Sequence, residues 1–447
     1  MAELTDIVER IVGWAGDDEQ VEAYASWGRD TDIEVYERDI ESLSSAETQG
    51  VGIRVVKDGR QGFAYAASFD TDVLEETFAE ARDNATFTEP DEWNGLTEPD
   101  GVAEATIEVW DGRLADVATA DKVDLALRLE RLVAEGDARI RAIESAAYGD
   151  AIVERALATT TGIRSALRRT VCSIAAYALA GEPDDTQTGF GFSVGRHVDD
   201  LDLDRAAADT VDRATRMLGA TKPESLRTTV VLDPFVTSQF LSIIGSTLNG
   251  ESVLKGRSLF ADRLGESVAA VGVTLVDDPT DVRTYGASPT DGEGLASRRN
   301  ALIDAGVLQQ YVYDTYSGRR SGAGSNACAV RGGFKGSPGP GCRALVLEPG
   351  PMSPDELLAS VSDGVLIQSV KGMHSGVNPI SGDFSTGADG LRITDGALGE
   401  PLREFTIGST IQKMLQGVIA VGNDLEFLPF SAAGQSLAIS DVTISGT

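Results

Sequence analysis

The chain has 447 residues, and its 71 acidic against 38 basic side chains give it a formal net charge of −33. This charge argues against nucleic acid or an anionic membrane as the main partner, because both require a basic surface. No apolar stretch reaches the roughly 18 residues of a membrane span and the N-terminus is acidic, so we expect a cytoplasmic protein.

Few of the basic residues are lysines. A carboxylate-rich surface with arginine in place of lysine is typical of a cytoplasm with molar salt, where the Debye length falls to roughly 3 Å and repulsion between like charges is screened. The composition therefore predicts a halophilic source, and an ordinary acidic mesophilic protein is the alternative.

The cysteines and histidines limit the metal chemistry. The two histidines, His197 and His374, are far apart, which excludes a helical zinc site built from two histidines. Cys172, Cys328 and Cys342 show no C-x-x-C spacing, so they predict buried thiols and not a disulfide framework. A zinc site from Cys328, Cys342 and His374 is the alternative.

Residues 1–90 predict a unit of helix, antiparallel strands and helix. Thr5 can cap the first helix. Asp58-Gly59 is typical of a hairpin turn, because this dipeptide supplies the positive φ angles that the turn needs. Strands are expected at residues 21–27, 33–37, 51–56 and 62–66, and a helix at 71–84. Residues 91–112, rich in Pro, Asp, Glu and Gly, predict an acidic linker.

Residues 113–221 repeat the order of the first unit. The expected elements are a helix at 122–135, extended segments at 140–147, 152–160, 165–180 and 189–194, and a closing helix at 203–218.

Residues 222–447 predict a large β-rich domain. A strand at 228–232 leads into Asp233 as N-cap and Pro234 as the first residue of a helix. Short strands with glycine-rich connections follow, interrupted by helices near 354–362 and 409–418. The expected fold class is α+β, with two related helix and antiparallel-sheet units followed by this β-rich domain.

Residues 374–390 read H-S-G-V-N-P-I-S-G-D-F-S-T-G-A-D-G, which we interpret as too irregular for a helix or strand. The run resembles the G-x-N-P-x-[ST]-G-D-[FY]-S-x-G-A-x-G stretch of the TldD/PmbA family, and more closely its PmbA (TldE) branch. Further family-like pieces lie at residues 52–64, 230–234, 277–279, 291–294 and 419–424.

In the TldD branch, the resemblance implies a zinc motif H-E-x-x-G-H on the helix after the V-x-L-x-P strand. Here Leu241, Ser242 and Ser246 stand at the positions of the zinc ligands and the general base. Leucine cannot bind zinc, and a neutral hydroxyl is a poor ligand or base. The family's third ligand, a cysteine near the C-terminus, is also missing, because no cysteine follows Cys342. We therefore expect no catalytic residue and no metal in this chain.

Five other residues are candidates for contacts with a peptide or a partner: His374, Asn378, Asp383, Asp291 and Glu293. The acidic pair flanking Gly292 could be a base or metal site, or a turn whose side chains accept main-chain hydrogen bonds. His374 could be a general base or a structural histidine. The glycine run lacks the lysine of a phosphate loop, so we interpret it as a shaped loop that another backbone can approach.

The resemblance implies a metal-free TldE-type subunit of a TldD/TldE metallopeptidase complex that degrades unfolded or extended peptides. Zinc is then expected in a partner subunit, a TldD-like paralogue carrying H-E-x-x-x-H, although a homodimer is also open. One alternative is a self-sufficient metallopeptidase with an unrecognised site. The other is a non-enzymatic, protein-binding modulator of a topoisomerase.

Overall fold

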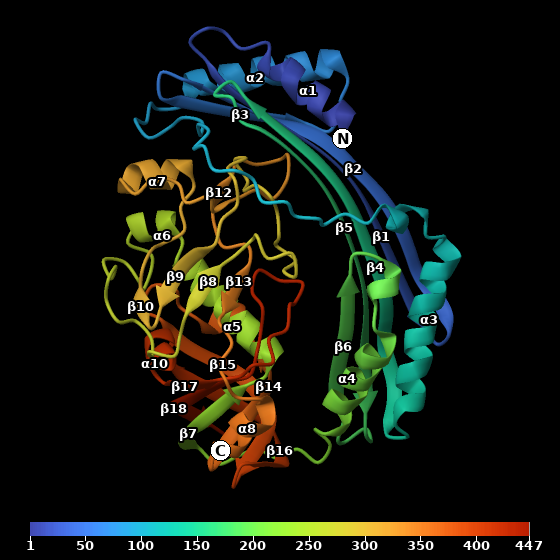
Figure 1. Ribbon diagram of the computed structural model, residues 1–447. Coiled ribbons are helices and arrows are strands. Elements are labelled where there is room, and N and C mark those ends of the chain that lie inside the picture. Colours follow the sequence, from blue (N-terminus) through green and yellow to red (C-terminus); the bar gives the residue numbers. More distant parts are fainter. Residues whose placement is uncertain (447) are drawn as a thin grey trace.

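The computed structural model describes residues 1–446, except for the side chains of Ala2 and His374. Figure 1 shows the first six strands as one long, curved sheet that arches around a second domain built from the remaining strands. The first four helices cover one face of this sheet, and the C-terminal domain packs against the other face. The fold is α+β, with two related units followed by a β-rich domain, as the sequence predicts.

The first unit runs helix, three strands, helix. Its elements are α1 (Ala2–Val12), β1 (Gln20–Tyr36), β2 (Asp39–Lys57), β3 (Arg60–Ala66) and α2 (Thr71–Phe87). The hairpin between β2 and β3 turns at Asp58 and Gly59, whose φ angles are 51° and 72°. These are the positive angles that this dipeptide is expected to supply.

The second unit repeats this order. Its elements are α3 (Thr119–Gly136), β4 (Ile140–Thr159), β5 (Arg164–Ala180), β6 (Gln187–Gly195) and α4 (Leu203–Thr215), with short 3₁₀ turns at Gly112–Asp116 and Val198–Asp200. Strands β1 and β4 pair antiparallel, so the units share one sheet of order β3-β2-β1-β4-β5-β6. Each unit adds its strands outward from this central pair.

Two strands are longer than predicted, because each joins two segments that the sequence analysis separates: residues 21–27 and 33–37 in β1, and 140–147 and 152–160 in β4. The residues between these segments include glycine and aspartate, which break the hydrophobic alternation. Asp150 nevertheless stays in the ladder, opposite Thr31. Its carboxylate lies 2.5 Å from the Lys122 ammonium and accepts a hydrogen bond of 2.8 Å from Tyr148. A tertiary ion pair therefore keeps the polar stretch in the sheet.

The segment between the units, residues 89–111, contains no helix or strand. It is nonetheless fastened along its length. Leu96 and Val109 are buried. The carbonyl of Leu96 accepts a hydrogen bond of 2.7 Å from Arg319, and that of Val109 accepts one of 3.0 Å from the main chain of Thr170. The linker thus lies against both the sheet and the C-terminal domain.

The centre of the C-terminal domain is a sheet of order β16-β15-β14-β7-β18-β17 in which β16 also pairs with β18, so that its strands curl toward a closed barrel. These strands are β7 (Leu226–Leu232), β14 (Asp363–Lys371), β15 (Asp383–Thr394), β16 (Ala397–Thr410), β17 (Val418–Val421) and β18 (Leu437–Ser445). A smaller sheet contains β8 (Leu275–Asp277), β9 (Asn300–Asp304), β10 (Val307–Leu308) and β13 (Leu345–Leu347), and a two-stranded ladder contains β11 (Ala329–Val330) and β12 (Gly339–Pro340).

The helices of this domain are α5 (Pro234–Thr247), α6 (Gly250–Leu254), α7 (Thr315–Ser321), α8 (Pro354–Ala359), α9 (Met373–Gly376) and α10 (Ile411–Gln416). Of these, α6, α7 and α9 are not predicted, because they are too short to show helical periodicity. The interpretation of residues 374–390 as wholly irregular is wrong, since the run begins in α9 and its last residues lie in β15. Among residues 1–446, no helix has the length and apolarity needed to cross a membrane.

Candidate functional site

Helix α5 begins as the sequence predicts. Asp233 accepts a hydrogen bond of 2.9 Å from the main chain of Phe235, and Pro234 is the first helical residue. The Asp233 carboxylate also lies 3.1 Å from the guanidinium of Arg213 on α4. This cap directs the helix from the end of β7 into the core of the C-terminal domain.

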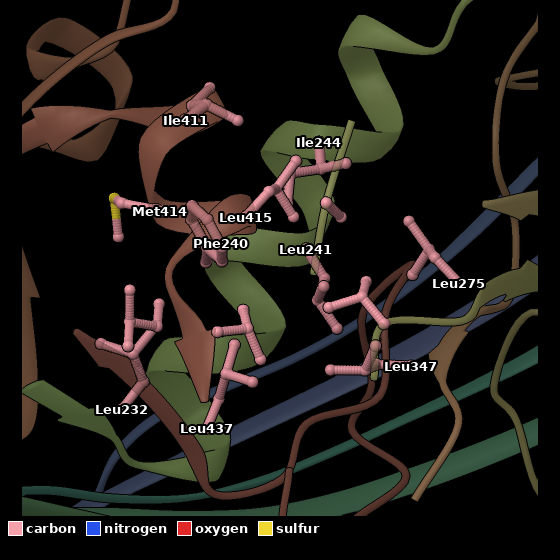
Figure 2. Packing of buried hydrophobic residues seen from close by; sticks show 14 of the residues in the cluster. Leu232, Phe240, Leu241, Ile244, Leu275, Leu347, Ile411, Met414, Leu415 and Leu437 are labelled. Carbon is pink, nitrogen blue, oxygen red and sulfur yellow. The ribbon is translucent and has the colours of Figure 1, made fainter. Parts of the chain in front are cut away.

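Leu241, at the first ligand position of the zinc motif, is a core residue with an exposed fraction of 2%. Figure 2 shows it beside Ile244 of the same helix and near Leu275 and Leu347, which come from β8 and β13. Phe240 packs its ring edge-on against Phe384 of β15, with 5.9 Å between ring centres. The strand that follows the glycine run therefore packs directly on this helix.

The two serines of the degenerate motif contact only neutral groups. The Ser242 hydroxyl lies 3.4 Å from the Ser431 hydroxyl, in the loop before β18. Ser246 is exposed and donates a hydrogen bond of 2.7 Å to the carbonyl of Ile243, one turn earlier. Among the side chains that the structure describes, neither serine contacts a histidine, carboxylate or lysine that could activate it as a nucleophile.

These residues do not fit a zinc ion. Zinc in proteins takes imidazole, thiolate or carboxylate ligands, whereas α5 offers an aliphatic side chain and neutral hydroxyls at the motif positions. Among the side chains that the structure describes, no group of three or more His, Cys, Asp and Glu residues could hold a metal ion. The His374 side chain lies outside the described part of the chain.

Gly245, the retained glycine of the motif, is required by close packing. A Cβ at this position would lie 2.3 Å from Leu345 and 3.3 Å from the sulfur of Cys342. Burial raises the pKa of Cys342 and Cys328 well above the usual range, so both thiols stay protonated. Cys172, Cys328 and Cys342 are free thiols, of which the first two are buried and Cys342 is partly buried.

Asp291 and Glu293 are buried, and their oxygens are occupied within the chain. Asp291 accepts hydrogen bonds of 2.9 Å from the main chain of Glu293 and Leu295, and one of 3.1 Å from that of Ala329. Glu293 accepts hydrogen bonds from both the main chain and the hydroxyl of Thr315, at 2.9 and 2.7 Å. The pair is a structural turn in the interior, and neither carboxylate faces solvent where a peptide could reach it.

Glu293 also belongs to a buried ionic network between the sheet and the C-terminal domain. Glu22 on β1 lies 2.8 Å from Arg54 on β2 and 2.6 Å from Arg331, and Arg54 lies 3.7 Å from Glu293. Burial acts to raise the pKa of Glu22, but the two guanidinium groups outweigh it and hold that pKa below its usual value. For Glu293 burial prevails over Arg54 and raises the pKa to about 7.

Asn378 and Asp383 shape the turn of the glycine run. The Asn378 side chain accepts hydrogen bonds from the main chain of Ile380 and Ser381, at 2.9 and 3.2 Å. Asp383 is exposed and accepts a hydrogen bond of 2.7 Å from the hydroxyl of Ser381. Of the five candidate contact residues, these two are on the surface, and the structure does not bring them together with the buried Asp291–Glu293 pair.

A cleft that the sequence analysis does not identify lies between the second unit and the C-terminal domain. It has a volume of about 370 Å³ and is lined by residues 190–194 of β6, by α4, by Phe235 and by residues 425–428. The signal for it is the alternation in Gly189-Phe190-Gly191-Phe192, which places aromatic rings on one face of β6 and none on the other. The sequence predicts only that this segment is extended. The length of a strand does not indicate whether it is purely structural or also binds a ligand.

Comparisons with known proteins agree with this architecture. Family models described as PmbA/TldA metallopeptidase domain 1, central domain and C-terminal domain match residues 21–85, 112–218 and 225–446. The Metalloprotease PmbA of Escherichia coli O157:H7 is 24% identical over 91% of this chain and 88% of its own length. A metalloprotease of Methanothermobacter thermautotrophicus is 25% identical over 98% and 94%.

The crystal structure of TldE from Thermococcus kodakarensis superposes with a TM-score of 0.89 at 22% identity and covers 100% of both chains. This likeness extends over all three parts of the fold. The three domain matches show that the chain belongs to the PmbA/TldD metallopeptidase family.

Proposed function

We propose that this chain is a cytoplasmic, metal-free subunit of the TldE type, which assembles with a zinc-carrying, TldD-like paralogue in the proteolysis of unfolded or extended peptides. The partner would carry the H-E-x-x-x-H motif and hydrolyse the peptide bond. This chain would enclose the peptide and bind its backbone. Assembly with a second copy of itself is the alternative.

The observation that carries the proposal is the environment of α5. An active zinc peptidase needs an open, polar surface at the ligand positions, so that metal, water and substrate can meet. In this chain the first ligand position is the core residue Leu241, and the retained Gly245 is packed against Leu345. Restoring a metal site here would require removal of part of the hydrophobic core.

The first experiment measures zinc and peptidase activity in the isolated chain. We expect less than a tenth of an equivalent of zinc after dialysis and no cleavage of casein or an unfolded peptide. Near-equimolar zinc together with turnover would contradict the proposal and favour the self-sufficient metallopeptidase.

The second experiment tests assembly. The chain is co-expressed with a TldD-like protein that carries H-E-x-x-x-H, and the complex is isolated through a tag on one subunit. We expect a stoichiometric complex that cleaves peptides only when both chains are present. Activity of the paralogue that does not depend on this chain would refute the subunit role.

A further inference from the structure

Strand β6 forms one edge of the six-stranded sheet, since it pairs only with β5. In an antiparallel ladder, main-chain groups of alternate residues point toward and away from the neighbouring strand. The carbonyl of Val194 accepts a hydrogen bond of 2.8 Å from the Tyr285 hydroxyl, outside the sheet. Phe192 and Phe190 lie two and four residues before Val194, so their main-chain groups also point to the free edge.

The neighbouring strand β5 independently gives the same alternation. The Thr170 main-chain N–H donates a hydrogen bond to the linker carbonyl of Val109. This N–H points to the side of β5 on which β6 lies, further along the strand. Cys172 therefore also points toward β6 and pairs with Gly195, which leaves the Val194, Phe192 and Phe190 positions directed outward. Within residues 1–446, neither phenylalanine has a main-chain hydrogen bond beyond the sheet.

A groove runs along this free edge. Five consecutive residues, 190–194, line the cleft of about 370 Å³, so the cleft follows the edge of the strand and not one face of it. A second cavity of about 260 Å³ is lined by residues 186–188 and again by Phe190, and its other wall includes Gln368 and Arg403. The two cavities together accompany β6 from one end to the other, with α4 on one side and the C-terminal domain on the other.

The two faces of β6 differ sharply in chemistry. On one face, a Cβ at Gly189 or Gly191 would lie within 2.3 Å of main-chain oxygens of α4, so that face is fully occupied by the helix. On the other face, the Phe190 ring lies 4.7 Å from that of Phe235, which in turn lies 5.7 Å from Phe430. Phe430 is 44% exposed, so the aromatic surface opens to solvent.

The walls of the cleft carry more negative than positive charge. Four carboxylates line it, those of Asp200, Asp202, Asp209 and Glu426, against two guanidinium groups. Both arginines already have acidic partners, since Arg205 lies 2.6 Å from Glu426 and 3.6 Å from Asp209, and Arg213 lies 3.1 Å from Asp233. The unmatched charge favours a basic or neutral ligand over an acidic one.

We propose that β6 binds an extended peptide as a seventh strand of the sheet. The peptide main chain would pair with the outward groups of Phe190 and Phe192. Aromatic or aliphatic side chains of the peptide would pack on the aromatic face of β6, and its basic side chains would lie toward Asp200 and Asp202. This inference rests on the proposed role in peptide proteolysis and assigns the peptide site of this chain to the edge of β6.

The first test scans the main chain of the ligand. The probe is a fluorescein-labelled peptide of alternating threonine and phenylalanine with lysine at each end, and its binding to the full chain is followed by fluorescence anisotropy. Single N-methyl groups are placed at successive positions. Methylation should weaken binding by about tenfold at every second position and by less than about twofold between them, because only alternate N–H groups face β6. Equal effects at all positions would overturn the proposal.

The second test uses a matched pair of variants. Phe192→Ala removes the ring and keeps the outward N–H, whereas Phe192→Pro removes both without breaking a bond to β5. We expect the proline variant to bind the probe about tenfold more weakly than the alanine variant, at the same melting temperature. Equal affinities at equal stability would overturn the proposal. So would a proline variant that dissociates a dimer of the chain and keeps its affinity for the probe, since the edge would then join two copies.

These outcomes are distinguishable from failure of the proposed function. A chain that assembles with its paralogue and supports hydrolysis, but binds no probe at β6, keeps the subunit role and loses the peptide site. A chain that shows the alternating methylation pattern, but whose paralogue is fully active alone, keeps the peptide site and loses the subunit role.

Discussion

The core around α5 and the contact between the N-terminal sheet and the C-terminal domain are both buried, but they contain opposite chemistry. At α5, Leu241 is surrounded by aliphatic side chains, and the Ser242 and Ser246 hydroxyls contact only neutral groups. At the contact between sheet and domain, Glu22, Arg54 and Glu293 are almost completely buried charged or titratable groups. The charges buried at this contact therefore join the N-terminal sheet to the C-terminal domain.

The two regions should consequently respond in opposite ways to changes in charge. A buried ion pair adds little to stability relative to a well-packed apolar pair, but removing one partner leaves a charge with no compensation. Adding a charge should damage the α5 region, and removing one should damage the ionic network.

The largest effect is expected for Leu241→Asp. An unpaired carboxylate would be forced into the aliphatic cluster, at a cost of about 5 kcal/mol or more in the free energy of unfolding. Urea denaturation followed by circular dichroism measures this loss. Leu241→Met is the control, and it should cost less than about 1.5 kcal/mol because the volume is conserved. A stable Leu241→Asp protein that binds zinc would show that the helix still forms a metal site.

The second effect is expected for Arg54→Met. This change leaves Glu22 with Arg331 alone and removes the opposite charge nearest to Glu293, so we expect a loss of about 4 kcal/mol in the free energy of unfolding. The matched control is Arg113→Met, because Arg113 is exposed and pairs with Asp111 at the surface. That control should leave the unfolding curve unchanged. Equal effects of the two changes would show that the buried network does not hold the units together.

The salt dependence of the melting temperature distinguishes the effect of surface charges from that of buried charges. Raising KCl from about 0.1 to 2 M should raise the melting temperature by many degrees. Salt screens the repulsion among the acidic side chains, which outnumber the basic ones by 71 to 38. The same rise should persist in Arg54→Met, because buried charges are screened much less. A melting temperature that does not change with salt would remove the halophilic interpretation of the composition.

The pH dependence of stability should report on Glu293. Burial raises its pKa to about 7 from a usual value of 4.5, although Arg54 opposes the shift and Asp291 and Asp314 reinforce it. Between these two values the folded chain holds a proton that the unfolded chain releases, so this group lowers the free energy of unfolding as the pH rises through the window. Glu293→Gln, which cannot ionise, should gain stability relative to the parent chain between pH 5 and pH 8. A constant difference across this range would contradict the shift.

Local chemistry explains which parts of the fold could be predicted. Asp58-Gly59 predicts the hairpin because its turn angles are encoded in the dipeptide itself, and Asp233-Pro234 predicts the start of α5 for the same reason. The continuity of β4 could not be predicted, because the partner that compensates the buried Asp150 carboxylate, Lys122, comes from a separate helix. Sequence patterns of local range do not contain such tertiary compensation.

In the candidate site, too, the features that could be predicted are those that depend on residue identity alone. That Leu241, Ser242 and Ser246 lack metal-binding chemistry follows directly from their identities. The burial of Glu293 could not be foreseen, because it depends on Arg54 from the first unit and Thr315 from the C-terminal domain. The free edge of β6 could not be predicted either, because the sequence does not determine which strand lies at the edge of the sheet.

The smallest effect is expected for Ser246→Ala. The hydroxyl is exposed and bonds only to the carbonyl of Ile243 in its own helix, so its removal should change the free energy of unfolding by less than about 0.5 kcal/mol. Assembly with the H-E-x-x-x-H paralogue and the peptidase rate of the complex should both stay within twofold of the parent, because no substrate or metal role is assigned to this serine. Pull-down and single-turnover cleavage measure the two quantities separately. A variant that assembles normally and loses hydrolysis would show that α5 takes part in the chemistry of the complex, although most of the helix packs in the hydrophobic core.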